Sequence, residues 1–378
     1  MAKSKYLWSF CLVIGLTHPV CAANVMSEDL LLGTSVGSSV AETESKAEDN
    51  NEKNNTASTV TSFITKPLSL LFSANDEVET EEGKKETYLE RATRQAEEGK
   101  IEDQMNLAYM YLYGTNGVKE DYDLAFKYYS MAAEQNDPIA MNNLGSLYFS
   151  GIGTKVSHKK ALALFERAAE LGNDNAAVNL AFIYLTGSTK DMKRNQTAMK
   201  LFQQAAAKSN KIACFMLGYA YYRGFVLPQD YGKALKFIKI AADQDAQFDE
   251  AQLVLAEIYI NGYGTVQNYH KAIASVKAAV AQGNPEALMI LGKIYTEGVV
   301  SMPNRLKAHA LYNIAASMGM PEAAAKRDAI GAKLKLQELT QAQEIAQQYK
   351  ANPSELTTYV QQTFGLEVRH YIDNNMVK

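Results

Sequence analysis

The sequence predicts an all-α protein built from helical hairpins in tandem, and three periodic features support this prediction. A Leu followed by Gly or Ala recurs six times at steps of 36 to 38 residues, a tyrosine stands four residues after each Leu, and a glycine three residues after each tyrosine. Self-similarity at periods of 20 to 50 residues is the signature of a solenoid. The six sets are Leu107, Tyr111, Gly114; Leu144, Tyr148, Gly151; Leu180, Tyr184, Gly187; Leu217, Tyr221, Gly224; Leu255, Tyr259, Gly262; and Leu291, Tyr295, Gly298.

Each repeat is expected to hold two helices joined by a polar loop. Leu and Tyr four positions apart share one helical face, and the small residue after Leu lets a neighbouring helix approach closely. The glycine is expected to end the first helix in a left-handed conformation. A second set of alanines, with a small pair starting seven residues later, predicts a narrow packing seam on the second helix. These alanines are Ala125, Ala161, Ala198, Ala234, Ala272 and Ala308.

Residues 1–22 have the tripartite pattern of a secretory signal peptide. Lys3 and Lys5 precede an apolar run of about eleven residues, and Val20-Cys21-Ala22 provides a plausible cleavage site. This run is shorter than the roughly 18 residues expected of a transmembrane helix. The alternatives are a retained membrane anchor and a lipoprotein at Cys21, although the residues before Cys21 fit the lipoprotein pattern poorly.

Residues 23–85 are predicted to form a disordered acidic linker. They carry 12 acidic and 5 basic residues within a chain of net charge −4, so the remainder of the mature chain is close to neutral. Such composition cannot bury enough apolar surface to offset the entropy of ordering. An apolar patch at Phe63-Ile64 and Leu68 to Phe72 is either a chance cluster or a docking segment for a partner or for the repeats.

The remaining chain divides into a solenoid over residues 86–349 and a C-terminal part. Residues 86–101 are predicted to be a half-repeat cap, residues from about 102 to 320 six full repeats, and residues 321–349 the C-terminal capping helices. Residues 350–378 are expected to add a C-terminal helix and a tail. With three cysteines and a pI near 5.9, the composition excludes a disulfide framework and gives no reason to expect nucleic acid as a partner.

The repeat pattern resembles the Sel-one-like repeat (SLR), a relative of the tetratricopeptide repeat. The stretches NNLGSLYFSGIG at 142–153 and KKALALFERAAELGN at 159–173 carry the resemblance. It implies a right-handed α-solenoid with a concave inner surface. It also implies a role in protein–protein interaction, since similar SLR proteins act in envelope assembly, signalling regulation and contacts between pathogens and host cells.

The sequence offers little for catalysis, and no metal or cofactor is expected. No HExxH motif, Cys pair or close His/carboxylate cluster appears. Ser157 to Lys160 formally matches the SxxK motif of penicillin-binding enzymes, but its companion motifs are missing, and Ser157 is expected to cap a helix. The lone mature cysteine, Cys214, is expected to be buried and inert.

The candidate binding site is therefore the inner wall of the solenoid. By resemblance to tetratricopeptide repeats, the first helix of each repeat lines this wall, with an asparagine ladder and aromatic or basic anchors. The alternative is that these residues form core between repeats. The candidates are Asn106, Asn143, Asn179, Tyr109, Tyr113, Phe149, Phe182, Tyr219, Tyr222, Arg223 and Lys293.

The function predicted from these features is that of a non-enzymatic adaptor of the cell envelope. Its partner would be a protein or an extended peptide segment, including an envelope or host protein, and it would have no transmembrane segment after signal removal. The expected location is the bacterial periplasm, with secretion, the outer surface and an endoplasmic-reticulum relative as alternatives. The alternative function is a protein or enzyme that binds cell-wall ligands such as peptidoglycan or penicillin-like molecules.

Overall fold

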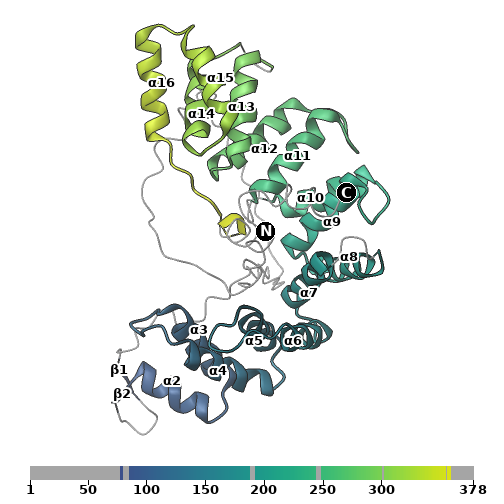
Figure 1. Ribbon diagram of the computed structural model, residues 1–378, viewed down its shortest axis with the longest axis vertical. Coiled ribbons are helices and arrows are strands. Elements are labelled where there is room, and N and C mark those ends of the chain that lie inside the picture. Colours follow the sequence, from purple (N-terminus) through teal and green to yellow (C-terminus); the bar gives the residue numbers. More distant parts are fainter. Residues whose placement is uncertain are drawn as a thin grey trace, which may run out of the picture. The chain divides into compact units, whose positions relative to one another are not determined.

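The computed structural model describes residues 77–79, 85–187, 192–243, 248–299, 302–354 and 356–358 (Figure 1). The predicted signal peptide, the apolar patch near Pro67 and nearly all of the predicted linker lie outside these residues. The chain forms two compact units. The first holds the described residues up to Leu291 and from Ala351 onward, and the second holds those from Gly292 to Lys350.

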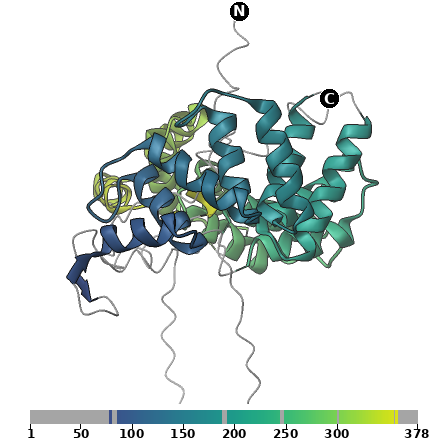
Figure 2. The same ribbon diagram turned by 90° about the horizontal axis from the view of Figure 1, so that it is seen from below.

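The described helices follow one another in antiparallel pairs, as the sequence predicts, and between residues 88 and 281 each packs on the next in the chain. Figure 2 shows the teal helices of the first unit standing side by side. The first helices are α3 (Ile101–Tyr113), α5 (Pro138–Ser150), α7 (Asp174–Gly187), α9 (Lys211–Arg223), α11 (Asp249–Asn261) and α13 (Pro285–Glu297), and the last of these contains the boundary between the units. The second helices are α4 (Tyr122–Glu134), α6 (His158–Glu170), α8 (Met192–Ala207), α10 (Tyr231–Ala241), α12 (Tyr269–Ala281) and α14 (Arg305–Ser317).

A small hairpin that the sequence did not predict precedes the first described helix. Strands β1 (Glu77–Glu79) and β2 (Lys85–Thr87) pair antiparallel, with Val78 opposite Glu86, inside the last part of the predicted linker. Thr87 then caps helix α2 (Tyr88–Glu97): its hydroxyl accepts from the Glu90 N–H at 3.2 Å, and the Glu90 carboxylate accepts from the Thr87 N–H at 2.9 Å. This capping box fixes where the helical part begins.

The ends of the first helices follow the predicted chemistry. Gly114, Gly151, Gly224 and Gly262 take up left-handed conformations, with φ between 59° and 73°, immediately after their helices. A left-handed residue lets the chain turn without a clash at Cβ. The second helices α4, α10, α12 and α14 begin at side chains that accept from the backbone N–H three residues later, namely Asp121, Asp230, Asn268 and Asn304.

Where the small residue after the repeated Leu is a glycine, it allows the two helices of the hairpin to pack closely. A Cβ atom placed on Gly218 of α9 would lie 2.8 Å from the Ile238 side chain of α10, and one on Gly145 of α5 would lie 2.9 Å from the Phe165 ring of α6. In both hairpins a large side chain of the second helix occupies the space that a glycine leaves open. The predicted close approach of helices is thus confirmed as a contact within one repeat.

The repeated tyrosine has a second role that its spacing from Leu does not reveal. In five repeats its ring lies beneath a cation from the start of the second helix, a favourable arrangement between the charge and the electron-rich ring face. In the first repeat, Tyr111 instead stacks on Tyr128, with ring centroids 6.1 Å apart. The cation–ring pairs are Lys160 on Tyr148 (4.8 Å), Arg194 on Tyr184 (5.6 Å), Lys233 on Tyr221 (5.1 Å), Lys271 on Tyr259 (5.5 Å) and Lys307 on Tyr295 (5.6 Å).

The second unit continues after α14 with α15 (Pro321–Gly331) and α16 (Leu336–Gln348), and each of these two helices packs on α14. Of the predicted C-terminal helix and tail, the structure describes residues 350–354 and a single helical turn at 356–358. Among the described helices, none is both long enough and apolar enough to cross a membrane.

We expect Gly218→Ala to lower the free energy of unfolding by about 1–3 kcal/mol, because the added methyl group overpacks the contact with Ile238. Urea denaturation followed by circular dichroism measures this change. Gly232→Ala is the matched control: Gly232 is exposed on α10, and its added Cβ would meet only Asp230 at an ordinary 3.4 Å. That control should be neutral or stabilising by up to about 1 kcal/mol. Equal effects of the two substitutions would contradict the close contact.

Candidate functional site

Most of the predicted groove residues lie inside the helical packing. Tyr113 and Phe149 are half-buried, and Arg223 and Lys293 are exposed, with Lys293 in the second unit. The seven others are buried, with less than one tenth of each residue exposed: Asn106, Asn143, Asn179, Tyr109, Phe182, Tyr219 and Tyr222. A first helix of this fold has neighbours on nearly every side, so that residues predicted to line a groove are largely covered.

Two of the predicted asparagines belong to a buried chain of amides. The Asn179 amide donates to Asn142 Oδ1 at 2.9 Å, which links the third repeat to the second, and the Asn142 amide donates to Asn143 Oδ1 at 3.4 Å. Asn143 in turn hydrogen bonds to the hydroxyl of Tyr129. These bonds favour the alternative in which the asparagines join neighbouring helices. Asn142, which completes the chain, was not singled out from the sequence.

The predicted aromatic residues pack mainly on other rings. The Tyr109 and Tyr113 centroids are 4.7 Å apart, and Phe182 meets Phe202 of α8 edge-on at 5.3 Å. Tyr222 lies near Tyr263, which follows the first helix of the next repeat, with centroids 6.1 Å apart. Burial and a hydrogen bond to Glu257 raise the pKa of the Tyr222 phenol. This ring therefore contributes to the contact between the fourth and fifth repeats.

Ser157 and Lys160, the two residues of the SxxK match, make contacts that the sequence did not predict. Ser157 occupies the N-cap position of α6, but its side chain makes no capping hydrogen bond, so that part of the prediction is wrong. Lys160 Nζ lies 4.8 Å from the Tyr148 ring centroid and 3.4 Å from the Tyr148 hydroxyl. The lysine that would activate a nucleophilic serine thus belongs to the repeating cation–ring pairs.

In the part of the chain that the structure describes, no group of three or more His, Cys, Asp or Glu side chains could hold a metal ion. Cys214 is fully buried in α9, and burial raises the pKa of its thiol to about 11. Since the thiolate is the reactive form, this thiol is suited to packing and not to redox or nucleophilic chemistry.

The fifth repeat contains a site of polar contact with a distant part of the chain, which sequence reasoning missed. Residues 351–354 and 356–358 follow α16 in the chain, and the last three form the short turn drawn in yellow in Figure 1. Hydrogen bonds join them to the start of α11 and the end of α12. The Asn352 N–H donates to the Ala281 carbonyl at 2.8 Å, and the Asp249 N–H donates to the Thr357 hydroxyl at 3.2 Å. The Thr357 hydroxyl also contacts Gln282 Oε1. No sequence signal marks this site, because Asp249 and Thr357 are 108 residues apart.

Asp249 also belongs to a polar link between successive repeats. Asn284, at the start of α13, donates to Asp249 Oδ2 at 2.8 Å. Two repeats earlier, Asn210 at the start of α9 donates to Asp174 Oδ2 at the same distance. The acidic residue at the start of one first helix thus accepts from the amide that caps the next. At Asp249 this carboxylate additionally contacts Thr357.

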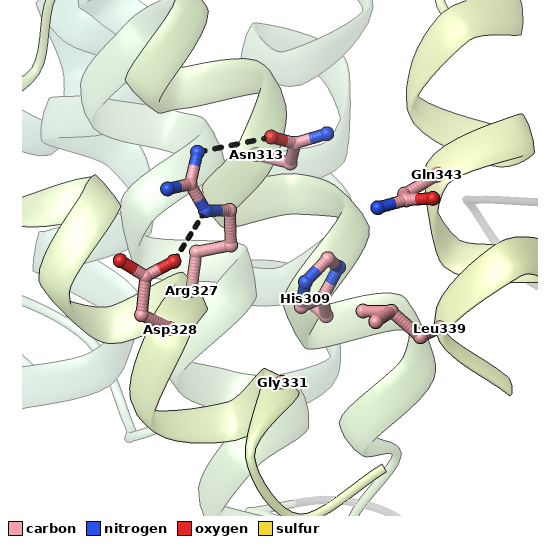
Figure 3. A pocket seen from close by; sticks show the side chains of 7 residues that line it. All are labelled: His309, Asn313, Arg327, Asp328, Gly331, Leu339 and Gln343. Carbon is pink, nitrogen blue, oxygen red and sulfur yellow. Dashed lines mark hydrogen bonds and ion pairs between the residues drawn. The ribbon is translucent and has the colours of Figure 1, made fainter. Parts of the chain in front are cut away.

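The second unit contains a pocket of about 390 Å³ (Figure 3). Arg327 Nε donates to Asp328 Oδ1 at 2.8 Å, and its guanidinium donates to Asn313 Oδ1 at 3.3 Å. His309 is only 4% exposed, and its Nδ1 has no hydrogen-bond partner within the described structure. The residues that line the pocket are His309, Asn313, Arg327, Asp328, Gly331, Leu339 and Gln343.

The stacked hairpins place this protein in the class of α-solenoids, which are helical-repeat proteins that present extended surfaces. The Sel1 repeat model matches residues 101–137, 138–173, 174–210, 211–245, 249–283 and 285–320, which together make up more than half of the chain. The chain belongs to the Sel1 repeat family, whose members are protein-interaction scaffolds. The family resemblance seen in the sequence is thereby confirmed.

Known relatives agree with this assignment. The crystal structure of a Sel1 repeat protein from Oxalobacter formigenes is 25% identical, with a TM-score of 0.51 over 68% of this chain and 75% of that chain. An ERAD-associated E3 ubiquitin-protein ligase component, HRD3A of Arabidopsis thaliana, is 31% identical over 34% of this chain and 21% of its own length. Chitin synthase regulatory factor 3 of Schizosaccharomyces pombe is 28% identical over 39% of this chain and 16% of its own length. The chain thus matches about a fifth or less of these two curated relatives.

The buried His309 predicts a pH dependence of stability. Burial and the Arg327 charge lower its pKa in the folded chain, against a weaker opposing effect of Asp328. As the pH falls below about 6.5, the unfolded chain takes up a proton that the folded chain resists, so stability decreases. We therefore expect the urea concentration at the unfolding midpoint to decrease as the pH is lowered from about 7.5 to about 5.5. The decrease should be smaller in His309→Gln.

The exposed His270 of α12 provides the control for this measurement. His270→Gln should keep the pH dependence of the wild type. An identical pH dependence in His309→Gln and the wild type would show that His309 does not contribute to it.

Proposed function

We propose that this protein is a non-enzymatic adaptor that binds extended peptide segments of partner proteins on the surface of its repeats. The observation that supports this proposal is the segment 351–358 bound against α11 and α12. The bond from the Asn352 N–H to the Ala281 carbonyl uses backbone groups alone, and the Thr357 hydroxyl adds side-chain recognition. Peptide binding commonly combines these two kinds of contact, affinity from the main chain and specificity from selected side chains.

The proposed location is the bacterial periplasm, with an envelope or host protein as partner. This part of the proposal rests on the signal-like pattern of residues 1–22 and the acidic, polar composition of residues 23–85. A polar linker of this length would separate the repeats from whatever holds the N-terminal end.

The alternative proposal is a protein or enzyme that acts on the cell wall through Ser157 and Lys160. The engagement of Lys160 with the Tyr148 ring speaks against it, because a base that activates a serine must lie within hydrogen-bonding reach of that serine's hydroxyl. The resemblance to SLR proteins implies a disulfide in each repeat for members that bind penicillin-like molecules, whereas this chain has one cysteine beyond the predicted signal.

The proposal is tested by selecting peptides from a random-sequence display library on the immobilised full chain. We expect the selected peptides to bind reversibly in solution, at least about tenfold more tightly than scrambled versions of the same composition, a difference that corresponds to one or two specific hydrogen bonds. Isothermal titration calorimetry on the wild-type chain measures both affinities.

The alternative function is tested by incubating the chain with a fluorescent penicillin and measuring covalent labelling. Covalent labelling that is lost in Ser157→Ala would contradict the adaptor proposal and support the cell-wall enzyme. Failure of the library to yield any peptide above background would also contradict the proposal.

A further inference from the structure

The described residues from Ala351 to Thr358 belong to the first unit, although they follow the second unit in the chain. The last of these residues form a short turn that begins at Ser354: the Thr357 N–H donates to Ser354 Oγ at 3.1 Å, and the Thr358 N–H donates to the Ser354 carbonyl at 2.8 Å. A serine hydroxyl that caps a turn in this way is a common local motif. The turn directs Leu356, which is 8% exposed, and Thr357, which is fully buried, against the repeat.

The receiving residues come from the fifth repeat, and we call the group formed by Asp249, Ala281 and Gln282 the Thr357 socket. The backbone N–H of Asp249 lies in the first turn of α11, where no carbonyl of the same helix can accept from it, and it donates to the Thr357 hydroxyl at 3.2 Å. Asp249 Oδ1 lies 3.2 Å from the same hydroxyl, and Gln282 Oε1 also contacts it. Asp249 and Gln282 are 1% and 3% exposed, so the socket is a buried polar site.

The resident segment does not satisfy this socket completely. A hydroxyl carries one proton, and Thr357 Oγ1 faces two acceptors, Asp249 Oδ1 and Gln282 Oε1, only one of which can receive it. The Gln282 Nε2 group is buried without a hydrogen-bond partner within the described structure. A buried donor left unpaired is unfavourable, and a ligand with a suitably placed carbonyl would gain from pairing it.

We propose that the Thr357 socket is a recognition site for a Ser-x-x-Thr turn of a partner protein, and that residues 351–358 are an internal occupant that the partner displaces. This inference rests on the proposed function, because it specifies the ligand of a peptide-binding repeat. The partner's threonine is unphosphorylated, because a phosphate group would place about two negative charges beside the Asp249 carboxylate. The unpaired Gln282 donor gives a partner turn with an additional acceptor an advantage over the resident one.

An internal occupant competes strongly with any free peptide. Its covalent link keeps it at an effective concentration of about millimolar near the socket, so a peptide with the same contacts binds the wild-type chain only weakly. Weakening the internal turn should therefore expose the socket to external ligands.

The test uses the full chain and a fluorescein-labelled synthetic peptide of residues 350–360, with binding measured by fluorescence anisotropy. Thr357→Glu places a negative charge beside Asp249 and should eject the internal turn, so that the peptide binds this variant at least about tenfold more tightly than the wild type. Thr358→Glu adds the same charge one residue later, at a half-buried position, and should bind the peptide as weakly as the wild type. Circular dichroism melting checks that both variants remain folded.

Two altered peptides test the chemistry of the socket without changing the protein. Replacing the threonine at position 357 with valine preserves its shape but removes the hydroxyl, and we expect at least about tenfold weaker binding to the Thr357→Glu chain. The phosphothreonine peptide should show no measurable binding. Equal binding of the threonine and valine peptides, or equal affinity of the wild-type and Thr357→Glu chains, would overturn the proposal.

The result also separates this inference from the proposed function. If library-selected peptides bind the chain but the 350–360 peptide neither binds Thr357→Glu nor competes with them, the socket proposal fails while the adaptor proposal stands. If no peptide of either kind binds, both fail.

Discussion

The close contact between the two helices of each repeat is the constraint on which the other features depend. Where a glycine follows the repeated Leu, as at Gly145 and Gly218, a large side chain of the second helix lies against the first helix backbone. This geometry brings the start of the second helix near the repeated tyrosine, whose ring receives a cation such as Lys160 or Lys233. It also covers the first helices so thoroughly that α9 and α11 bury residues around most of their circumference. Polar groups on these helices must therefore find partners inside the protein.

The buried polar side chains connect neighbouring repeats, and one of them, Asp249, also belongs to the proposed binding site. Asn179 donates to Asn142, and Asn284 donates to Asp249, so that buried amides and carboxylates join the third and sixth repeats to their predecessors. Because hydrogen bonds are directional and apolar packing is not, these bonds favour one register between the helices that they join. At Asp249 the same carboxylate and the backbone N–H of α11 also contact Thr357. A residue that holds the repeats together is thereby available to recognise a peptide hydroxyl.

The sequence predicted the features that repeat and missed those that depend on contacts distant in the chain. The period, the helical hairpins and the glycine helix ends were predictable, because each follows from local spacing and from the conformational freedom of glycine. The hairpin at Glu77–Glu79 was missed, because strands rich in Glu and Lys carry no apolar alternation. The predicted site residues were chosen by analogy of position, and seven proved to be buried, as Phe182 and Tyr219 illustrate. Asn142 and the Thr357 socket could not be found, because their partners lie 37 and 108 residues away and no pattern links them.

The central claim is that the repeats bind chain segments by satisfying backbone and hydroxyl groups in buried polar sites. Hydrogen exchange at the Asp249 amide tests it most directly, because this N–H has no acceptor within its own helix and donates to Thr357. In the full-length wild type, the account predicts slow exchange at Asp249 that accelerates by about tenfold or more when Thr357 is replaced by valine, with amides in the middle of α9 unchanged. Identical exchange at Asp249 in the two proteins would show that the segment does not occupy this site and would contradict the account.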